Sequence, residues 1–123
     1  MATCEILVVD DDPDLSAVLA DFVESMGVHV LRASNGQQAL DLLDGHQPSV
    51  VLIDLFMPVM GGIELLRTIR RSPTWGAIPC VIMTGANDQM VGVKEDVSVL
   101  YKPFDTEAVA AILEQYCLPP APA

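Results

Sequence analysis

Residues 5–14 read Glu5-Ile6-Leu7-Val8-Val9-Asp10-Asp11-Asp12-Pro13-Asp14. A short, continuous apolar run ends abruptly in three acids and a proline. A run of this kind predicts a strand buried on both faces, as in a parallel sheet. Proline is favoured at the first helical position and aspartate just before it, so Asp12 is the expected N-cap, with Asp14 favourable to the helix dipole. The stretch therefore predicts a buried strand that passes through an acidic turn into a helix.

The same alternation of strand and helix recurs along the chain. Strands are predicted at residues 6–9, 28–31, 50–53, 78–83 and 97–101. Helices are predicted at residues 15–26, closed by Gly27, then after Gly36, at 63–69, weakly around 89–94, and around 109–113. Strands buried on both faces imply helices on both sides of a parallel sheet. Right-handed crossovers then favour a doubly wound, flavodoxin-like α/β fold.

Composition narrows the class of protein. The chain has 123 residues, 51% of them apolar, which is ample for the core of one domain. Its net charge of −11 opposes direct binding to nucleic acid or to an anionic membrane, and favours basic partners or a bound cation. No apolar run approaches the ~18 residues of a membrane span, and the first residues lack a signal-peptide pattern. We expect a cytoplasmic protein.

The three cysteines, Cys4, Cys80 and Cys117, are widely spaced and form no CxxC pair. Only His29 and His46 could add nitrogen ligands, so the sequence does not favour a zinc site. We expect three reduced thiols, with Cys80 packed inside a strand, His29 on a strand and His46 in a loop.

Polar side chains follow four of the predicted strands. Asp10 and Asp11 follow the first, Asp54 the third, Thr84 the fourth and Lys102 the fifth. Parallel strands end at one edge of a sheet, where such folds bind ligands. Each residue alone could be a cap or a solvated side chain. Four independent explanations are less economical than one shared site.

Three neighbouring carboxylates require a cation. Two carboxylates ~4 Å apart repel by roughly 4 kcal/mol at an effective dielectric near 20. Carboxylate oxygens select Mg²⁺, which also binds phosphate oxygens. In such a site an ionised Asp54 is a competent nucleophile toward phosphorus, while Lys102 and Thr84 could hold phosphate oxygens.

Four motifs along the chain resemble the receiver domain of bacterial two-component response regulators, from Glu5 to about Cys117. They are the opening strand with its acids (residues 6–13), the loop that begins at Asp54 (residues 54–62), Met83-Thr84-Gly85, and Lys102-Pro103-Phe104. The resemblance implies strand order 2-1-3-4-5, a receiver at residues 1–117, and a Pro/Ala-rich tail or linker at residues 118–123.

The resemblance also implies roles for the site. Asp54 would accept a phosphoryl group from a histidine kinase or phosphotransfer protein, and the domain itself would assist the transfer. Thr84 and Lys102 would bind phosphoryl oxygens. Mg²⁺ would be held by Asp11, Asp54 and the backbone carbonyl of Phe56, with Asp10 acting mainly through metal-bound water. The output would be a partner surface, a phosphorelay step or a further domain, and the expected state is a monomer or weak dimer.

The chain departs from the family pattern in three places. Val99 stands where an aromatic switch residue is usual, and Tyr101, on the same face of the strand, is the hypothetical substitute, acting with Thr84. The interval from Thr84 to Lys102 is about one helical turn shorter than usual, which predicts a short or irregular fourth helix. Phe56 follows the acceptor closely, and its bulk predicts slow loss of the phosphoryl group.

Two other classes match parts of the opening. Asp10-x-Asp12 is typical of haloacid-dehalogenase-type phosphatases, in which Asp10 would be the nucleophile, but the chain is short for that fold and Asp14 replaces the usual Thr or Val. A calcium loop needs glycine where Leu15 stands. A further alternative is a pseudo-receiver, an interaction module that keeps the fold without phosphorylation control.

Overall fold

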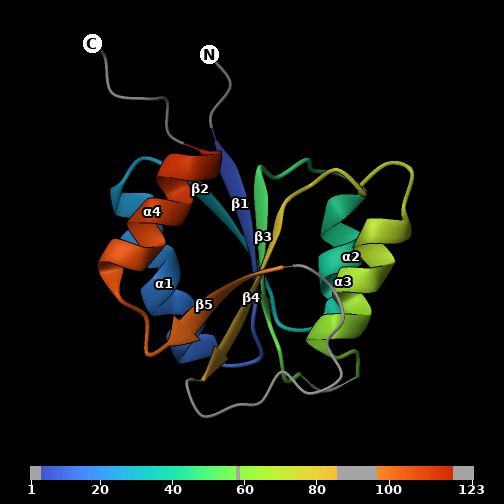
Figure 1. The fold of residues 1–123 in the computed structure, drawn as a ribbon, viewed down its shortest axis with the longest axis horizontal. Helices are drawn as coiled ribbons and strands as arrows, with labels where there is room; N and C mark the ends of the chain where they lie inside the picture. The colour runs from blue at the N-terminus through green and yellow to red at the C-terminus, as the bar shows by residue number, and fades with distance from the viewer. Residues whose placement is uncertain (1–3, 58, 86–96, 118–123) are drawn as a thin grey trace.

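The computed structural model describes residues 4–57, 59–85 and 97–117. A five-stranded, fully parallel sheet has the order β2-β1-β3-β4-β5, as expected (Figure 1). In chain order the elements are β1 (Glu5–Val9), α1 (Pro13–Ser25), β2 (His29–Ala33), α2 (Gly36–Leu43), β3 (Val50–Asp54), α3 (Gly62–Arg71), β4 (Cys80–Gly85), β5 (Ser98–Lys102) and α4 (Thr106–Tyr116).

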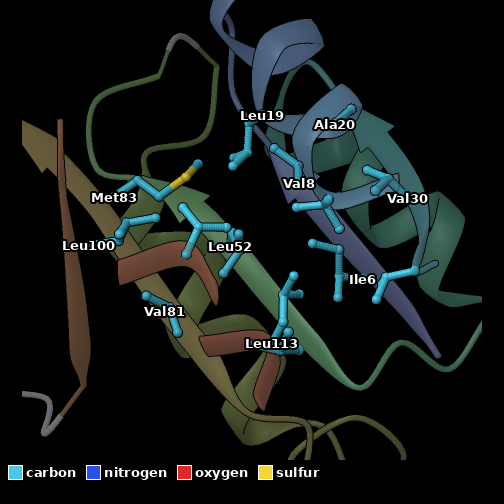
Figure 2. Packing of buried hydrophobic residues seen from close by; sticks show 14 residues of the cluster. Ile6, Val8, Leu19, Ala20, Val30, Leu52, Val81, Met83, Leu100 and Leu113 are labelled. Carbon is cyan, nitrogen blue, oxygen red and sulfur yellow. The ribbon is translucent and has the colours of Figure 1, made fainter. Parts of the chain in front are cut away.

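Helices cover both faces of the sheet. Figure 1 shows α1 and α4 on one side and α2 and α3 on the other. Alternate residues of each central strand point to opposite faces, so Ile6 and Val8 join the cluster under α1 and α4, whereas Leu7 and Val9 join the cluster under α2 and α3. Figure 2 shows the first cluster, in which Leu52, Val81 and other aliphatic side chains interdigitate. This burial on both faces explains why the strands are continuously apolar.

The ends of α1 agree with the local sequence. The Asp12 side chain accepts hydrogen bonds from the backbone N–H groups of Asp14 and Leu15, both at 3.1 Å, and Pro13 is the first helical residue. Gly27 follows the helix with a φ of +86°, a conformation that glycine adopts without steric cost. The acidic turn after β1 therefore leads straight into a well-capped helix.

Most predicted elements are confirmed, with shifted boundaries. The second, fourth and fifth strands each begin and end one or two residues later than their apolar runs, and Asp54 is the last residue of β3. The predicted helix around residues 89–94 lies outside the described residues. His29 lies on β2, His46 in the loop after α2, and Cys80 is buried in β4, all as expected. No helix among residues 4–57, 59–85 and 97–117 has the length and apolarity to span a membrane.

The prediction of three reduced cysteines is wrong for two of them. Cys4 and Cys117 form a disulfide, with a Cα–Cα distance of 5.5 Å. They are 113 residues apart, so their spacing gave no sign of the pairing. The bond exists because α4 ends beside the start of β1, a proximity that the tertiary fold creates.

Candidate functional site

Three carboxylates converge at the carboxyl-terminal edge of the sheet. β1 and β3 are neighbours, so Asp10 and Asp11, just after β1, come close to Asp54 at the end of β3. One oxygen from each of the three lies within 4.8 Å of the others. Asp10 and Asp54 are buried, with 2% and 7% of their surface exposed, whereas Asp11 is exposed. The group therefore has one open side.

Lys102 completes the group from the far side. It ends β5, two strands away from β3, and its side chain reaches back over the edge of the sheet. Its Nζ lies 3.1 Å from Asp10 Oδ2 and 3.1 Å from Asp54 Oδ1. Asp10 Oδ1 also accepts a hydrogen bond from the backbone N–H of Asp12, at 3.0 Å. The ammonium group thus bridges the two buried carboxylates.

The three carboxylates carry more negative charge than Lys102 neutralises. Burial, followed by the charges of Asp10 and Asp11, raises the pKa of Asp54 to about 6, even though the hydrogen bond from Lys102 opposes this. Burial alone would lower the pKa of Lys102, but its contacts with Asp54 and Asp10 outweigh burial and raise it. One ammonium facing three carboxylates leaves an excess of negative charge. This excess suits a divalent cation.

Open space lies beside the carboxylates. A pocket of about 340 Å³ is lined by Asp11, Leu55, Phe56, Met57 and Gly61. Phe56 is 61% exposed at this pocket, so its ring stands beside the entrance and not in the core. Because Asp11 lines the pocket, a small anion or hydrated ion entering it would come close to the acidic group.

The remaining predicted site residues lie on β4 and β5. Thr84 is buried near the end of β4, and its register partner on β5 is Tyr101, which is 56% exposed. Val99 is half-buried two residues earlier on the same face of β5. The structure therefore brings together Asp10, Asp11, Asp54 and Lys102, and places Thr84 and Tyr101 side by side at the same edge.

The sequence did not predict one residue that stabilises the turn after β1. Arg32, on β2, donates from Nε to Ser16 Oγ and from Nη2 to the Pro13 carbonyl, both at 3.0 Å. Ser16 is buried, and Pro13 follows the acidic turn directly. Arg32 therefore fixes the first turn of α1 against β2 and steadies the turn that carries Asp11. The feature of the sequence that could have indicated this role is a single arginine within an apolar strand.

The fold and its site define a class, namely parallel α/β domains with a cluster of carboxylates at the carboxyl ends of β1 and β3. The family model described as "Response regulator receiver domain" matches residues 6–114. The chain belongs to this family, which makes it a receiver domain of the two-component response-regulator type. The haloacid-dehalogenase and pseudo-receiver alternatives are not favoured.

Relatives of different lengths share this domain. The chain is 34% identical to an uncharacterized 14.6 kDa protein of Leptolyngbya boryana, covering 96% of this chain and 93% of that protein. It is 33% identical to Protein PilH of Pseudomonas aeruginosa, covering 85% and 89%. It is 36% identical to the transcriptional regulatory protein CpxR of Escherichia coli over 88% of the chain, but spans only 47% of CpxR.

Solved structures agree with the fold. The chemotaxis protein CheY4 of Vibrio cholerae superposes with a TM-score of 0.81 at 24% identity, covering 94% of this chain and 99% of that one. The receiver domain of the Pseudomonas aeruginosa sensor histidine kinase PA1611 gives a TM-score of 0.81 at 26% identity, covering 94% and 98%. That structure has a magnesium ion coordinated in its active-site cleft.

Proposed function

We propose that Asp54 accepts a phosphoryl group from a histidine kinase or phosphotransfer protein in a Mg²⁺-dependent reaction. The observation that carries the proposal is the bridge from Lys102 Nζ to Asp10 and Asp54, at 3.1 Å each, inside a cluster of three carboxylates. Such a group can hold both a cation and a phosphate. The domain is then a switch that assists its own phosphorylation and dephosphorylation.

The donor set fits Mg²⁺. Asp11, Asp54 and the backbone carbonyl of Phe56 would be the protein ligands, and Asp10 would act mainly through a metal-bound water. All are oxygen donors, and the three side chains are close enough to share one ion. When bound, the ion neutralises charge on the phosphate. Burial, followed by the charges of Asp10 and Asp11, raises the pKa of Asp54, and a bound cation would favour its ionised form.

The chain's own residues position the reacting groups. An Asp54 carboxylate oxygen attacks phosphorus in line, the new O–P bond forms, and the bond to the donor's nitrogen breaks, with its electron pair passing to the leaving imidazole. Lys102, already held between Asp10 and Asp54, moves its hydrogen bond to a phosphoryl oxygen. Thr84 donates its hydroxyl hydrogen to another phosphoryl oxygen.

The signal leaves the site through β4 and β5. Thr84 and Tyr101 are register partners, and Val99 lies on the same face of β5 as Tyr101. Movement of Thr84 toward the phosphoryl group vacates space next to Tyr101, whose exposed side chain is free of core packing. The family usually has an aromatic switch residue at the position of Val99, and in this chain Tyr101 takes that role. A Tyr101 side-chain NMR spectrum unchanged on phosphorylation would exclude this role.

The partners follow from the family and the charge. Sensor histidine kinases themselves carry domains of this fold, as the similar structures show. We propose a cytoplasmic domain, residues 1–117, followed by a tail or linker at 118–123, acting as a monomer or weak dimer without direct nucleic-acid contact. Its output is a partner-binding surface, a phosphorelay step or a further domain.

The test is phosphorylation with a small acyl phosphate. Purified protein incubated with acetyl phosphate and Mg²⁺ should gain the mass of one phosphoryl group, and EDTA should prevent the gain. Asp54→Ala should gain none. Asp41→Asn, an exposed aspartate of α2, is the matched control and should behave as wild type. A phosphorylated Asp54→Ala variant would show that another residue is the acceptor, and an inert wild type would support a pseudo-receiver.

A further inference from the structure

The disulfide joins the two ends of the folded domain. Cys4 directly precedes β1, and Cys117 is the C-cap residue of α4. Figure 1 shows the start of β1 beside the end of α4, at the opposite edge of the sheet from the carboxyl ends of the strands. The bond therefore closes nearly the whole chain into one loop and lies far from the acidic pocket.

The backbone holds both cysteines independently of the bond. The Cys4 carbonyl accepts a hydrogen bond from the His29 N–H at 3.0 Å, which ties it to β2. The Cys117 N–H donates to the Leu113 carbonyl at 2.7 Å, which ties it to α4. Leu113, buried one turn before Cys117, keeps the end of α4 near the start of β1 even when the last turn loosens, so the bond can close again without refolding.

Small thiols can reach the bond. Both cysteines are only partly buried, at the rim of the cluster under α1 and α4. Cys4 Sγ also lies 3.3 Å from the Ser49 hydroxyl, a polar neighbour at the surface end of β3. Accessible disulfides are the ones that exchange readily with thiols, and a reducing compartment opens them.

We propose that Cys4 and Cys117 form a reversible redox site that responds to low-molecular-weight thiols of the glutathione class. In the opening direction, a thiolate attacks one sulfur, forms a mixed disulfide and releases the other cysteine. A second small thiolate then attacks the small-molecule sulfur of the mixed disulfide and releases the remaining cysteine as a thiolate. Two small thiols thereby become one disulfide, and the protein gains two electrons and two protons. Oxidised glutathione drives the reverse reaction.

The bond controls the last turn of α4. Val109 and Leu113 are fully buried and anchor the helix whatever the state of the bond. Tyr116 and Cys117 are only partly buried, so without the disulfide the final turn is held by fewer contacts. Opening the bond should therefore loosen this turn and the point from which the chain continues, and leave the acidic pocket unchanged.

Cys80 provides an internal reference. It is buried in β4, and burial raises the pKa of its thiol to about 11, so it is shielded and protonated at neutral pH. The oxidised protein should accordingly show one free thiol in denaturant and the reduced protein three. The Cys80→Ala variant should show no free thiol when oxidised and two when reduced.

The experiment equilibrates the full chain in mixtures of reduced and oxidised glutathione, alkylates it, and counts free thiols by mass. We expect a change between one and three free thiols within the range of ratios tested. On reduction, amide exchange of Tyr116 and Cys117 should quicken at least about tenfold, with little change in the buried strands. The variants Cys4→Ser and Cys117→Ser should exchange like the reduced protein.

Two outcomes would overturn the redox site. Three free thiols at every ratio would mean that the bond does not form in solution, and one at every ratio would mean that it is a fixed structural cross-link. The site goes beyond the phosphorylation proposal and is independent of it, because acetyl phosphate labelling should be equal in both redox states. Labelling that fails in both states would count against Asp54 and leave the redox site standing.

Discussion

At the scale of single residues, the buried Asp54 carboxylate destabilises the folded domain at neutral pH. Its side chain is 10% exposed and is held 3.1 Å from Lys102, yet burial outweighs that ion pair and its pKa rises from 3.8 to about 6. The folded protein therefore binds the Asp54 proton more tightly than the unfolded chain does. Between pH 4 and 7, the contribution of Asp54 to stability falls as the pH rises.

Asp54→Asn should stabilise the Mg²⁺-free protein at pH 7.5. The amide removes a destabilised carboxylate while Lys102 keeps its contact with Asp10, so we expect a gain of about 1–2 kcal/mol in the free energy of unfolding. At pH 4 most of the gain should vanish, because the wild-type carboxyl is then protonated in the folded state and only partly ionised in the unfolded chain. Urea unfolding in EDTA at both pH values measures it, with Asp41→Asn as the control. An equal effect at both pH values would contradict the charge explanation.

Phe56→Asn should shorten the lifetime of the aspartyl phosphate. The Phe56 ring lines the pocket beside Asp11, where it can exclude water from the phosphoryl group. A small polar side chain admits water, so we expect self-dephosphorylation to quicken several-fold. Decay of the labelled protein after removal of the donor gives the rate. Phe56→Leu, which keeps an apolar side chain there, should stay close to wild type, and an unchanged rate in Phe56→Asn would remove Phe56 from this role.

At the scale of elements, the connection from β3 to α3 depends on a close backbone approach. The N–H of Gly62, the first residue of α3, donates to the Leu55 carbonyl at 3.0 Å. A Cβ atom at Gly62 would lie 2.9 Å from the Cα of Leu55 and would overlap the Asp54 carbonyl oxygen. The helix can therefore begin against the end of the strand only because this residue has no side chain.

Gly62→Ala should destabilise the domain and slow its phosphorylation. The added methyl meets backbone atoms that cannot move independently, so we expect a loss of about 1–3 kcal/mol, typical of overpacking. Gly61→Ala is the matched control, because a Cβ there meets nothing within 4 Å and should cost at most about 1 kcal/mol. Urea midpoints and acetyl phosphate labelling test both variants. Equal losses would show that crowding at Asp54 is not the cause.

At the scale of the whole molecule, the concentration of negative charge predicts that a bound cation stabilises the folded state. The net charge is −11, and the three carboxylates gather at one edge of the sheet. A ligand that binds only the folded state stabilises it by about 2.7 kcal/mol at 100 times its dissociation constant. The unfolded chain cannot assemble this site, because its carboxylates come from two separate segments.

Mg²⁺ should therefore raise the thermal unfolding midpoint in a saturable way. Asp11→Asn should weaken this response by removing an exposed ligand from the group. Asp21→Asn, an exposed aspartate on α1, is the matched control and should respond as wild type. The scans are compared with NaCl at equal ionic strength, which separates binding from screening. If both variants keep the full response, the metal lies elsewhere.

The sequence alone determined the sheet, its helical layers and the residues at the strand ends. Apolar runs and helical spacing are local signals, and parallel strands end at one edge, so the sequence suffices to group Asp10, Asp54 and Lys102. Tertiary structure decided what depends on distance through space. The Cys4–Cys117 bond, the brace from Arg32 to α1 and the balance of burial against charge at Asp54 each join segments that have no common signal along the chain.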